Sequence, residues 1–324
     1  MLNVMHRVNN VAMHDTKSLF GINAAQFIEI VDQLALAKGK TNYSFMAADD
    51  YDRVIREDSD RATQIYWNQI LARAHLTAVV AILRSRHWIS AVVAAAKDKN
   101  LLAFAAALRG LIESSADTAS ALEAIPISFA ENHVLINRAL SGTLGKQFVI
   151  SSEIEDALIH FSHARHITKV ERPSVPRSHE ALKVRDYIEV LEKGKVHKVI
   201  TCYQSLCDLT HPGASSVWMW LTSENGVNFE LKPNQDESNI ADYLTEYRDT
   251  FLELLMFSFN PALVTLNVLN YFPLRTFHTL ALLDWNLSSI PSWQKCQSKF
   301  GDALPLAHKG LRSVKPNPAT HTDA

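Results

Sequence analysis

The sequence predicts a mainly α-helical protein, a multi-helix bundle with one small β-hairpin. Of its 324 residues, 47% are hydrophobic and 20% are charged, which is a globular composition. Apolar residues recur at the three- and four-residue steps of helix faces along most of the chain. Residues 217–231 alone resemble a hairpin, because two short β-type runs flank an Asn-Gly pair. We expect a single helical domain over residues 1–307 and a disordered tail over 308–324.

Helical spacing and end signals predict the elements in order. Asn23, with Gln26 three places on, is an N-cap pattern, and Gly39 ends that helix. Two helices are expected between about residue 60 and Lys97, the second starting near Arg86. The other predicted helices cover residues 47–57, 101–122, 127–140, 152–166, 180–191, 195–210, 239–259 and 261–271.

The predicted helix Leu101–Leu122 is small or apolar nearly all round. Its only charges, Arg109, Glu113 and Asp117, recur every four residues and therefore share one face. A helix of this composition is usually buried, and an unpaired buried charge costs several kcal/mol. We therefore expect these three side chains to be partly buried and paired.

The stretch Lys195–Gly213 predicts an amphipathic helix that ends at a His-Pro-Gly. Pro212 disfavours helical geometry at the residue before it, which places His211 at the helix C-terminus. If the two helices touch, their polar side chains form a site. Its catalytic candidates are His211, Arg109 and Glu113, and its binding candidates are Tyr203, Gln204, Asp208 and Asp117. The alternative is a structural network of an ordinary i,i+4 ion pair, a core tyrosine and a histidine that stabilises the helix end.

Two further clusters suggest other chemistry. Glu153, Asp156, His160 and His163 share one helical face and suit a transition metal, but no zinc motif such as HExxH occurs. We therefore predict no metal and no cofactor, and keep this His160 cluster as an alternative. The second cluster is a mildly basic belt, which consists of Arg165, Lys169, Arg172, Arg177 and Lys183. Such a belt either binds nucleic-acid phosphates or is an ordinary solvated surface.

Composition and missing motifs exclude several classes of protein. The formal net charge of -2 excludes a basic field over the whole protein, and three cysteines exclude a disulfide scaffold. P-loop, Rossmann and hydrolase-elbow motifs are absent. Phe251–Phe272 is long enough to span a bilayer, but Asn260-Pro261 predicts two shorter helices. We therefore expect a cytoplasmic protein without a membrane partner.

Two runs carry a family resemblance. Arg109–Asp117 (RGLIESSAD) and Tyr203–Pro212 (YQSLCDLTHP) resemble an uncharacterised bacterial family with an Arg-x3-Glu helix and a Tyr…His-Pro helix end. That family is similar to the HEPN superfamily of helical bundles, many of which are RNases in toxin–antitoxin and phage-defence systems. The resemblance implies a HEPN-like core at about residues 60–221, and the C-terminal helices that the residue pattern predicts at about 239–271 follow it. Active HEPN nucleases carry an Arg and a helix-end His with four to six residues between them, and nothing of that form precedes His211.

These observations favour a helical binding or interaction protein, and the resemblance implies a role in a bacterial stress or phage-defence system. We expect a protein partner or a second copy of the chain, and RNA is a further candidate. One alternative is a metal-independent RNase in which His211 is the general acid or base and Arg109 stabilises phosphorane charge. Another is a metal-dependent enzyme that uses the His160 cluster.

Overall fold

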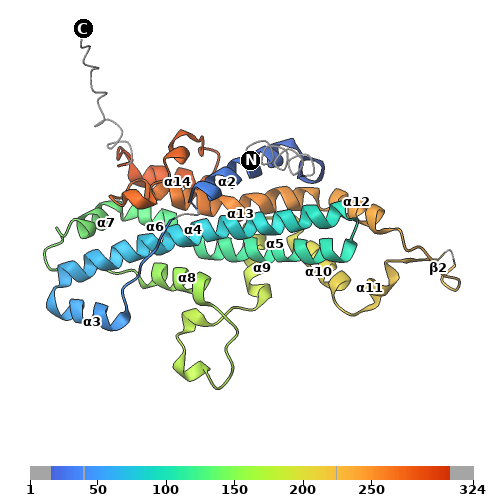
Figure 1. Cartoon of the computed structure of the whole chain (residues 1–324), viewed down its shortest axis with the longest axis horizontal. Coiled ribbons are helices and arrows are strands. Elements are labelled where there is room, and N and C mark those ends of the chain that lie inside the picture. The colour runs from blue at the N-terminus through green and yellow to red at the C-terminus, as the bar shows by residue number, and fades with distance from the viewer. Residues whose placement is uncertain (1–15, 39–40, 224, 307–324) are drawn as a thin grey trace, which may run out of the picture. The chain divides into compact units, whose positions relative to one another are not determined.

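The computed structural model describes residues 16–38, 41–223 and 225–306 (Figure 1). Within these residues the fold is mainly α with one two-stranded antiparallel sheet, which confirms the predicted class. The chain forms two compact units. Unit 1 comprises the described residues within Met1–Lys40, Thr77–Glu123 and Asp156–Ala262. Unit 2 comprises those within Thr41–Leu76, Ala124–Glu155 and Leu263–Ala324. The single domain stays a prediction, and the predicted tail 308–324 lies outside the described residues.

Three helices have residues in both units: α4 (Ser59–Lys97), α8 (Ser152–His163) and α13 (Arg248–Leu269). The other elements of unit 1 are α2 (Ile22–Lys38), α5 (Leu101–Leu122), η1 (Arg172–Ser174), η2 (Arg177–His179), α9 (Val184–Lys193), α10 (Val199–Thr210), α11 (Ala214–Trp218), β1 (Leu221–Thr222), β2 (Glu230–Leu231) and α12 (Asp236–Glu246). Those of unit 2 are α3 (Ala48–Glu57), α6 (Ile125–Glu131), α7 (His133–Leu140), η3 (Arg275–Phe277), η4 (Leu280–Asp284) and α14 (Pro291–Phe300).

Helix α5 lies at the centre of unit 1. It has the predicted boundaries, and Asn100 caps its N-terminus, since the Asn100 side chain accepts a hydrogen bond from the N–H of Ala103. It packs against α9, α10 and α12. Its largest apolar side chains are fully buried, namely Phe104, Leu108, Leu111 and Ile112. This packing leaves the face of Arg109 and Glu113 partly open to solvent.

The core of unit 2 joins α6 to α14. Phe129 of α6 meets Phe272 edge to face, with ring centroids 6.0 Å apart. Tyr271 stacks on Phe300 of α14 at 3.8 Å. Helix α14 was not predicted, although Pro291 at its first turn and the buried Trp293, Cys296 and Phe300 follow a helical pattern.

Two predicted helix breaks are wrong. Helix α4 runs unbroken through Arg86, where a second helix was expected, because neither Gly nor Pro interrupts residues 59–97. Helix α13 continues through Asn260-Pro261. A proline inside a helix costs about 3 kcal/mol. Residues 261–269 are all buried, and burying large apolar side chains offsets that cost.

Helices α4 and α13 are long and apolar enough to cross a membrane, judged by length and composition alone. In the most apolar 18-residue stretch of each helix, 44% of α4 and 72% of α13 is buried inside the protein. Burial in a protein core therefore accounts for much of the apolar sequence of α13.

Several element ends differ from the predicted ones. The predicted helix 127–140 is two helices, α6 and α7, which meet at Asn132. Helix α8 ends at His163 and α9 begins at Val184, because residues 164–183 form a loop with two short 3-10 turns. Helix α10 begins only at Val199, since Lys195 and Lys198 have left-handed backbone angles (φ 66 and 49). The hairpin is narrower than predicted, because Val217 and Trp218 belong to α11.

Gly110 of α5 allows a close approach between two helices of unit 1. A Cβ atom at this position would lie 2.6 Å from the ring of Trp88 on α4. We expect Gly110→Ala to lower the free energy of unfolding by about 1–2 kcal/mol, although alanine favours an isolated helix by about 1 kcal/mol. Chemical denaturation measures the change. Ala106→Gly, at an exposed position of the same helix, measures the difference in helix propensity between alanine and glycine without a steric contact. In a Trp88→Leu background Gly110→Ala should become stabilising, and a loss of stability there would contradict the steric cause.

Candidate functional site

The two helices singled out from the sequence, α5 and α10, pack together in unit 1. Glu113 of α5 joins them, since its Oε1 accepts a hydrogen bond of 2.6 Å from the hydroxyl of Tyr203 on α10. The same oxygen accepts a bond of 3.1 Å from Nε of Arg109, one turn earlier on α5. Glu113 therefore fixes a tyrosine of one helix and an arginine of the other.

Arg109 extends this arrangement to the C-terminus of α10. Its Nη1 lies 3.3 Å from Oγ1 of Thr210 and 3.4 Å from Nε2 of His211. His211 is exposed and follows the last helical residue with extended backbone angles, as Pro212 predicts. Because a guanidinium group only donates, Nε2 of His211 is the acceptor in this arrangement. We call Arg109, Glu113, Tyr203, Thr210 and His211 the polar cluster.

The charges of the polar cluster are matched. The side chains of Arg109 and Glu113 are 29% and 35% exposed, so this pair is partly buried, as predicted. Burial lowers the pKa of Arg109, but the hydrogen bond to Glu113 and the charges of Tyr203, Glu113 and Cys207 together raise it by more. Burial, and then Glu113, raise the pKa of Tyr203, which stays a neutral donor. The cluster thus presents one cation, one anion and a phenol whose proton is held by the anion.

Tyr203 is shared between the polar cluster and a pocket on the same face of unit 1. The pocket has a volume of about 300 Å³ and lies where α9 and α10 meet. We call it the Tyr203 pocket, and its lining residues are Arg185, Ile188, Glu189, Ile200, Tyr203 and Gln204. Arg185 and Glu189 pair at 3.3 Å, so its charged side chains are balanced as well.

The other predicted site residues lie in different surroundings. Asp117 does not join the polar cluster but pairs with Arg84 of α4 at 2.6 Å. Asp208 is exposed and makes no hydrogen bond or ion pair with the residues that the structure describes. Gln204 is exposed and lines the Tyr203 pocket.

Sequence reasoning missed several residues of this site. Thr210 directly precedes His211, and its position at the helix end was the available signal. Ile200 follows the apolar spacing of α10, which is typical of a core residue, but it lines the pocket. Arg185, Ile188 and Glu189 gave no signal, because only the packing of α9 against α10 brings them together with Tyr203.

The His160 cluster does not form a metal site. Nδ1 of His160 lies 3.0 Å from the carbonyl of Ser178, and Nε2 lies 2.6 Å from the hydroxyl of Tyr187, so both ring nitrogens are engaged. His163 instead stacks on the ring of His179. Across the part of the chain that the structure describes, no group of three or more His, Cys, Asp or Glu side chains is arranged to hold a metal ion. The metal-dependent alternative therefore has no ligand set in these residues.

The basic belt lies on the loop between α8 and α9 and is partly neutralised. Arg165 pairs with Glu171 at 2.8 Å, and Arg172 pairs with Glu180. The hydrogen bond from Arg165, together with those from Thr168, lowers the pKa of Glu171 to about 2. Two of the five cations are thus held by carboxylates, which favours a solvated surface over a phosphate-binding one.

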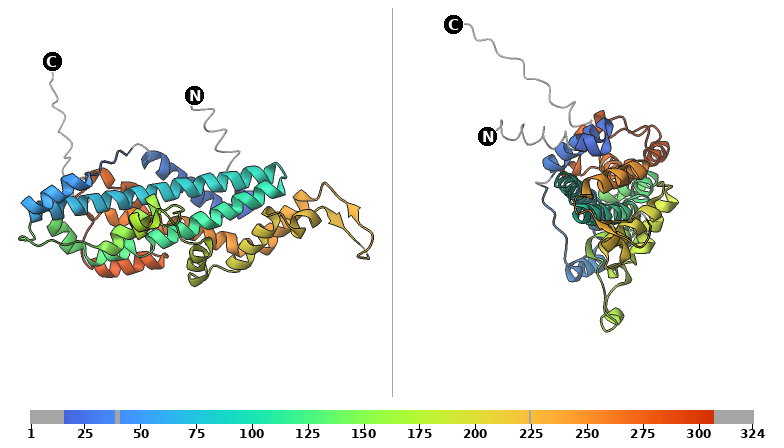
Figure 2. Two further views of the ribbon diagram at one scale, coloured as in Figure 1. Left: turned by 90° about the horizontal axis from the view of Figure 1, so that it is seen from below. Right: turned by 90° about the vertical axis from the view of Figure 1, so that its right-hand side faces the viewer.

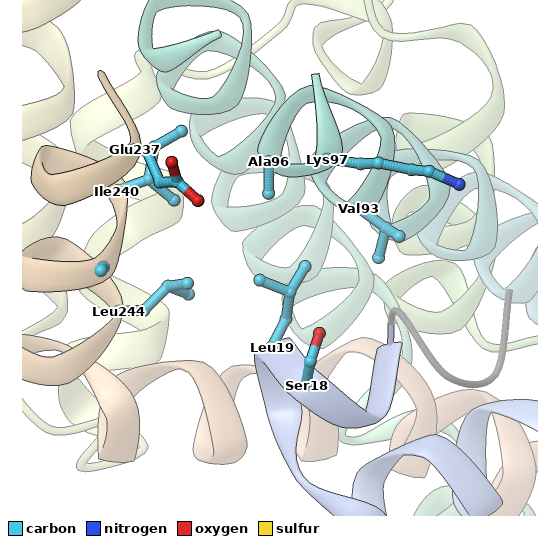
Figure 3. Close-up of a pocket in the computed structure, with 9 residues that line it drawn as sticks. Ser18, Leu19, Val93, Ala96, Lys97, Glu237, Ile240 and Leu244 are labelled. Atoms are coloured by element: carbon cyan, nitrogen blue, oxygen red, sulfur yellow. The ribbon is translucent and has the colours of Figure 1, made fainter. Parts of the chain in front are cut away.

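A second pocket of unit 1, of about 190 Å³, lies between the start of the described chain, α4 and α12 (Figure 3). Its walls are mostly apolar, with Leu19, Val93 and Leu244 reaching toward its interior. Glu237 at its edge pairs with Lys99 at 2.7 Å. No residue of the polar cluster lines this pocket, and we do not assign it to the candidate site.

No protein-family model matches the chain, and comparisons with curated proteins and with solved structures find no similar protein. The function proposed below therefore depends on the geometry of unit 1 and on the two short motifs in the sequence.

Proposed function

We propose that this protein is a binding module and that the Tyr203 pocket takes an apolar side chain of a protein partner. The observation that carries the proposal is the 2.6 Å hydrogen bond from Tyr203 to Glu113, which fixes one wall of the pocket before any ligand arrives. A wall held in place loses little conformational entropy on binding. Ile188 and Ile200 supply apolar surface beside it, and polar groups surround them.

The matched charges favour binding over catalysis. Glu113 accepts two hydrogen bonds, and Nε2 of His211 faces the guanidinium of Arg109. A general base needs a free lone pair, and here the nearest cation occupies it. In this proposal Arg109 and His211 are positioning residues, which hold Glu113 and the end of α10.

Peptide selection tests the proposal. Peptides chosen from a random phage-displayed library for binding to the full chain should lose affinity by about tenfold or more in Tyr203→Ala, as for other anchor residues in interface pockets. Ile200→Asp should act alike, because it places a charge on the apolar wall. Tyr203→Phe keeps the ring but removes the hydrogen bond to Glu113, so the loss of peptide affinity should be smaller than in Tyr203→Ala. Ile55→Asp, at an exposed position of α3, is the matched control. Peptides that bind Ile200→Asp as well as the unchanged protein would overturn the proposal.

A metal-independent RNase is the second candidate, because the side chain of Arg109 reaches His211 at the exposed C-terminal end of α10. In this candidate an RNA phosphate draws the guanidinium of Arg109 away from Nε2, which frees His211 to act as the acid or base. Arg109 is then the cation that faces the phosphorane. No second imidazole belongs to the polar cluster.

Cleavage assays in EDTA separate the two candidates. For the binding module we expect no cleavage of structured or single-stranded RNA. Cleavage that survives EDTA and falls by about 100-fold or more in His211→Ala would instead identify the RNase. Gln204→Ala is the control, because Gln204 lies on the same helix outside the Arg109–His211 pair. Circular dichroism of each variant separates lost activity from lost fold.

The wider assignment rests on the resemblance and on one contact between helices. We propose a HEPN-like bundle of a bacterial stress or phage-defence system in the cytoplasm. The contact between the Arg-x3-Glu helix and the His-Pro helix end supports this proposal, since the two short motifs meet in one site.

A further inference from the structure

The hairpin that follows α11 exposes an unusual amount of apolar surface. It extends beyond α11 and α12 in Figure 1 and in the left view of Figure 2. Trp218 and Phe229 lie against each other with ring centroids 4.8 Å apart, yet they are 48% and 49% exposed. Leu231 is 67% exposed and Val227 is 78% exposed. Exposed apolar groups gathered in one place commonly mark an interaction surface.

The outer edge of β2 is open for pairing. Lys232 donates its backbone N–H to the carbonyl of Trp220, and Leu221 lies opposite Leu231. Because backbone groups alternate along a strand, the N–H and C=O of Leu231 point away from β1. The sheet consists of β1 and β2, and no other strand in the described part of the chain covers this edge. An isolated two-stranded ribbon is only marginally stable, and a sheet of three or more strands is more stable.

We infer that β2 pairs antiparallel with β2 of a second copy of this chain, with the twofold axis at Leu231. In this register the two Leu231 residues lie directly opposite each other and exchange both backbone hydrogen bonds. Pro233 begins a turn, so the pairing between the two copies is confined to Glu230–Lys232. The result is a four-stranded sheet whose apolar side chains continue from one copy to the other.

Charge complementarity argues for a second copy as the occupant. Glu230 and Lys232 lie on the opposite face of β2 from Leu231, with a side-chain distance of 3.3 Å. Under the twofold axis at Leu231, Glu230 faces Lys232 of the other copy, and the reverse pair forms as well. Two opposite-charge pairs thus arise without any change in sequence. A membrane surface would instead favour several cations, which this strand lacks.

Charge reversal tests the interface. The unchanged chain should show a concentration-dependent dimer in sedimentation equilibrium. Glu230→Lys alone and Lys232→Glu alone should each weaken the dimer by roughly tenfold, because like charges then face each other. A mixture of these two variants should form a heterodimer, since one chain then carries two lysines and the other two carboxylates. Rescue by mixing separates pairing between chains from changes within one hairpin.

Two further variants complete the test. Leu231→Pro removes the outward N–H and leaves the bonds to β1, so it should abolish the dimer. Glu57→Lys, an equal charge change at an exposed position of α3, should leave it unchanged, and Tyr203→Ala should leave it unchanged because the Tyr203 pocket is a separate site. A chain that is monomeric at every concentration would overturn the inference. So would a dimer that Leu231→Pro does not affect, or a monomer that sediments with phosphatidylglycerol vesicles.

Discussion

Phe104→Ala is expected to lower the free energy of unfolding by about 3–5 kcal/mol, the usual cost of emptying a buried phenylalanine site. Phe104 is fully buried on α5 and meets the ring of Tyr243 edge to face at 6.3 Å. Its neighbours belong to helices that are held by other contacts, so the site cannot collapse to fill the space. Urea denaturation followed by circular dichroism measures the change.

Leu102→Ala is the matched control on the same helix. Leu102 is 39% exposed, and its truncation should change the free energy of unfolding by no more than about 0.5 kcal/mol. Phe129→Ala empties an equally buried site in unit 2. If the units unfold independently, the two buried variants will shift different transitions. A cost for Phe104→Ala close to that of Leu102→Ala would contradict the central place of α5.

Thiol labelling at pH 8 should separate the three cysteines by rate. Burial raises the pKa of Cys202 and of Cys296 from 9.0 to about 12. The thiolate is the nucleophile, so each unit of raised pKa lowers the reactive fraction about tenfold, or roughly 1,000-fold here. Cys207 is only half-buried and should react first. Dithionitrobenzoate absorbance gives the rates.

The Cys207→Ser variant is the control, because it should lose the fast phase and keep the slow one. In denaturant all three thiols should react alike. The sign of the pH effect follows from the raised pKa values. Folding favours the protonated thiols, so this contribution to stability is complete below pH 9.0 and is lost as the pH rises toward about 12. Labelling of Cys202 as fast as that of Cys207 would show that α10 opens in the native state.

The sequence predicted correctly those helices whose ends depend on caps and helix-breaking residues, and not those that depend on packing. The helix Leu101–Leu122 was predicted at its true ends, because Asn100 caps it and no breaker lies inside. The continuous α13 was not predicted, because the cost of Pro261 is local while the burial that offsets it comes from packing. Short helix ends, such as the start of α10 at Val199, depend on single backbone angles that composition does not specify.

The candidate site divides in the same way. Spacing placed Arg109 and Glu113 on one face of a helix, and Pro212 placed His211 at the end of another. Periodicity defines which face of a helix is apolar but not which helix covers it. Three features therefore could not be predicted from the sequence. They are the contact between α5 and α10, the pocket beside α9, and the ion pair of Asp117 with Arg84 in place of the polar cluster.

The division of the chain between the two units also bears on synthesis. Unit 1 takes its residues from three separate segments, the last of which ends at Ala262. A ribosome releases residues in order, so α5 emerges long before α10 and α12 can cover its apolar face. Native contacts of such large sequence separation form slowly, and the exposed helix is open to aggregation meanwhile. Truncated chains that end before Ala262 should accordingly need a chaperone to stay in solution.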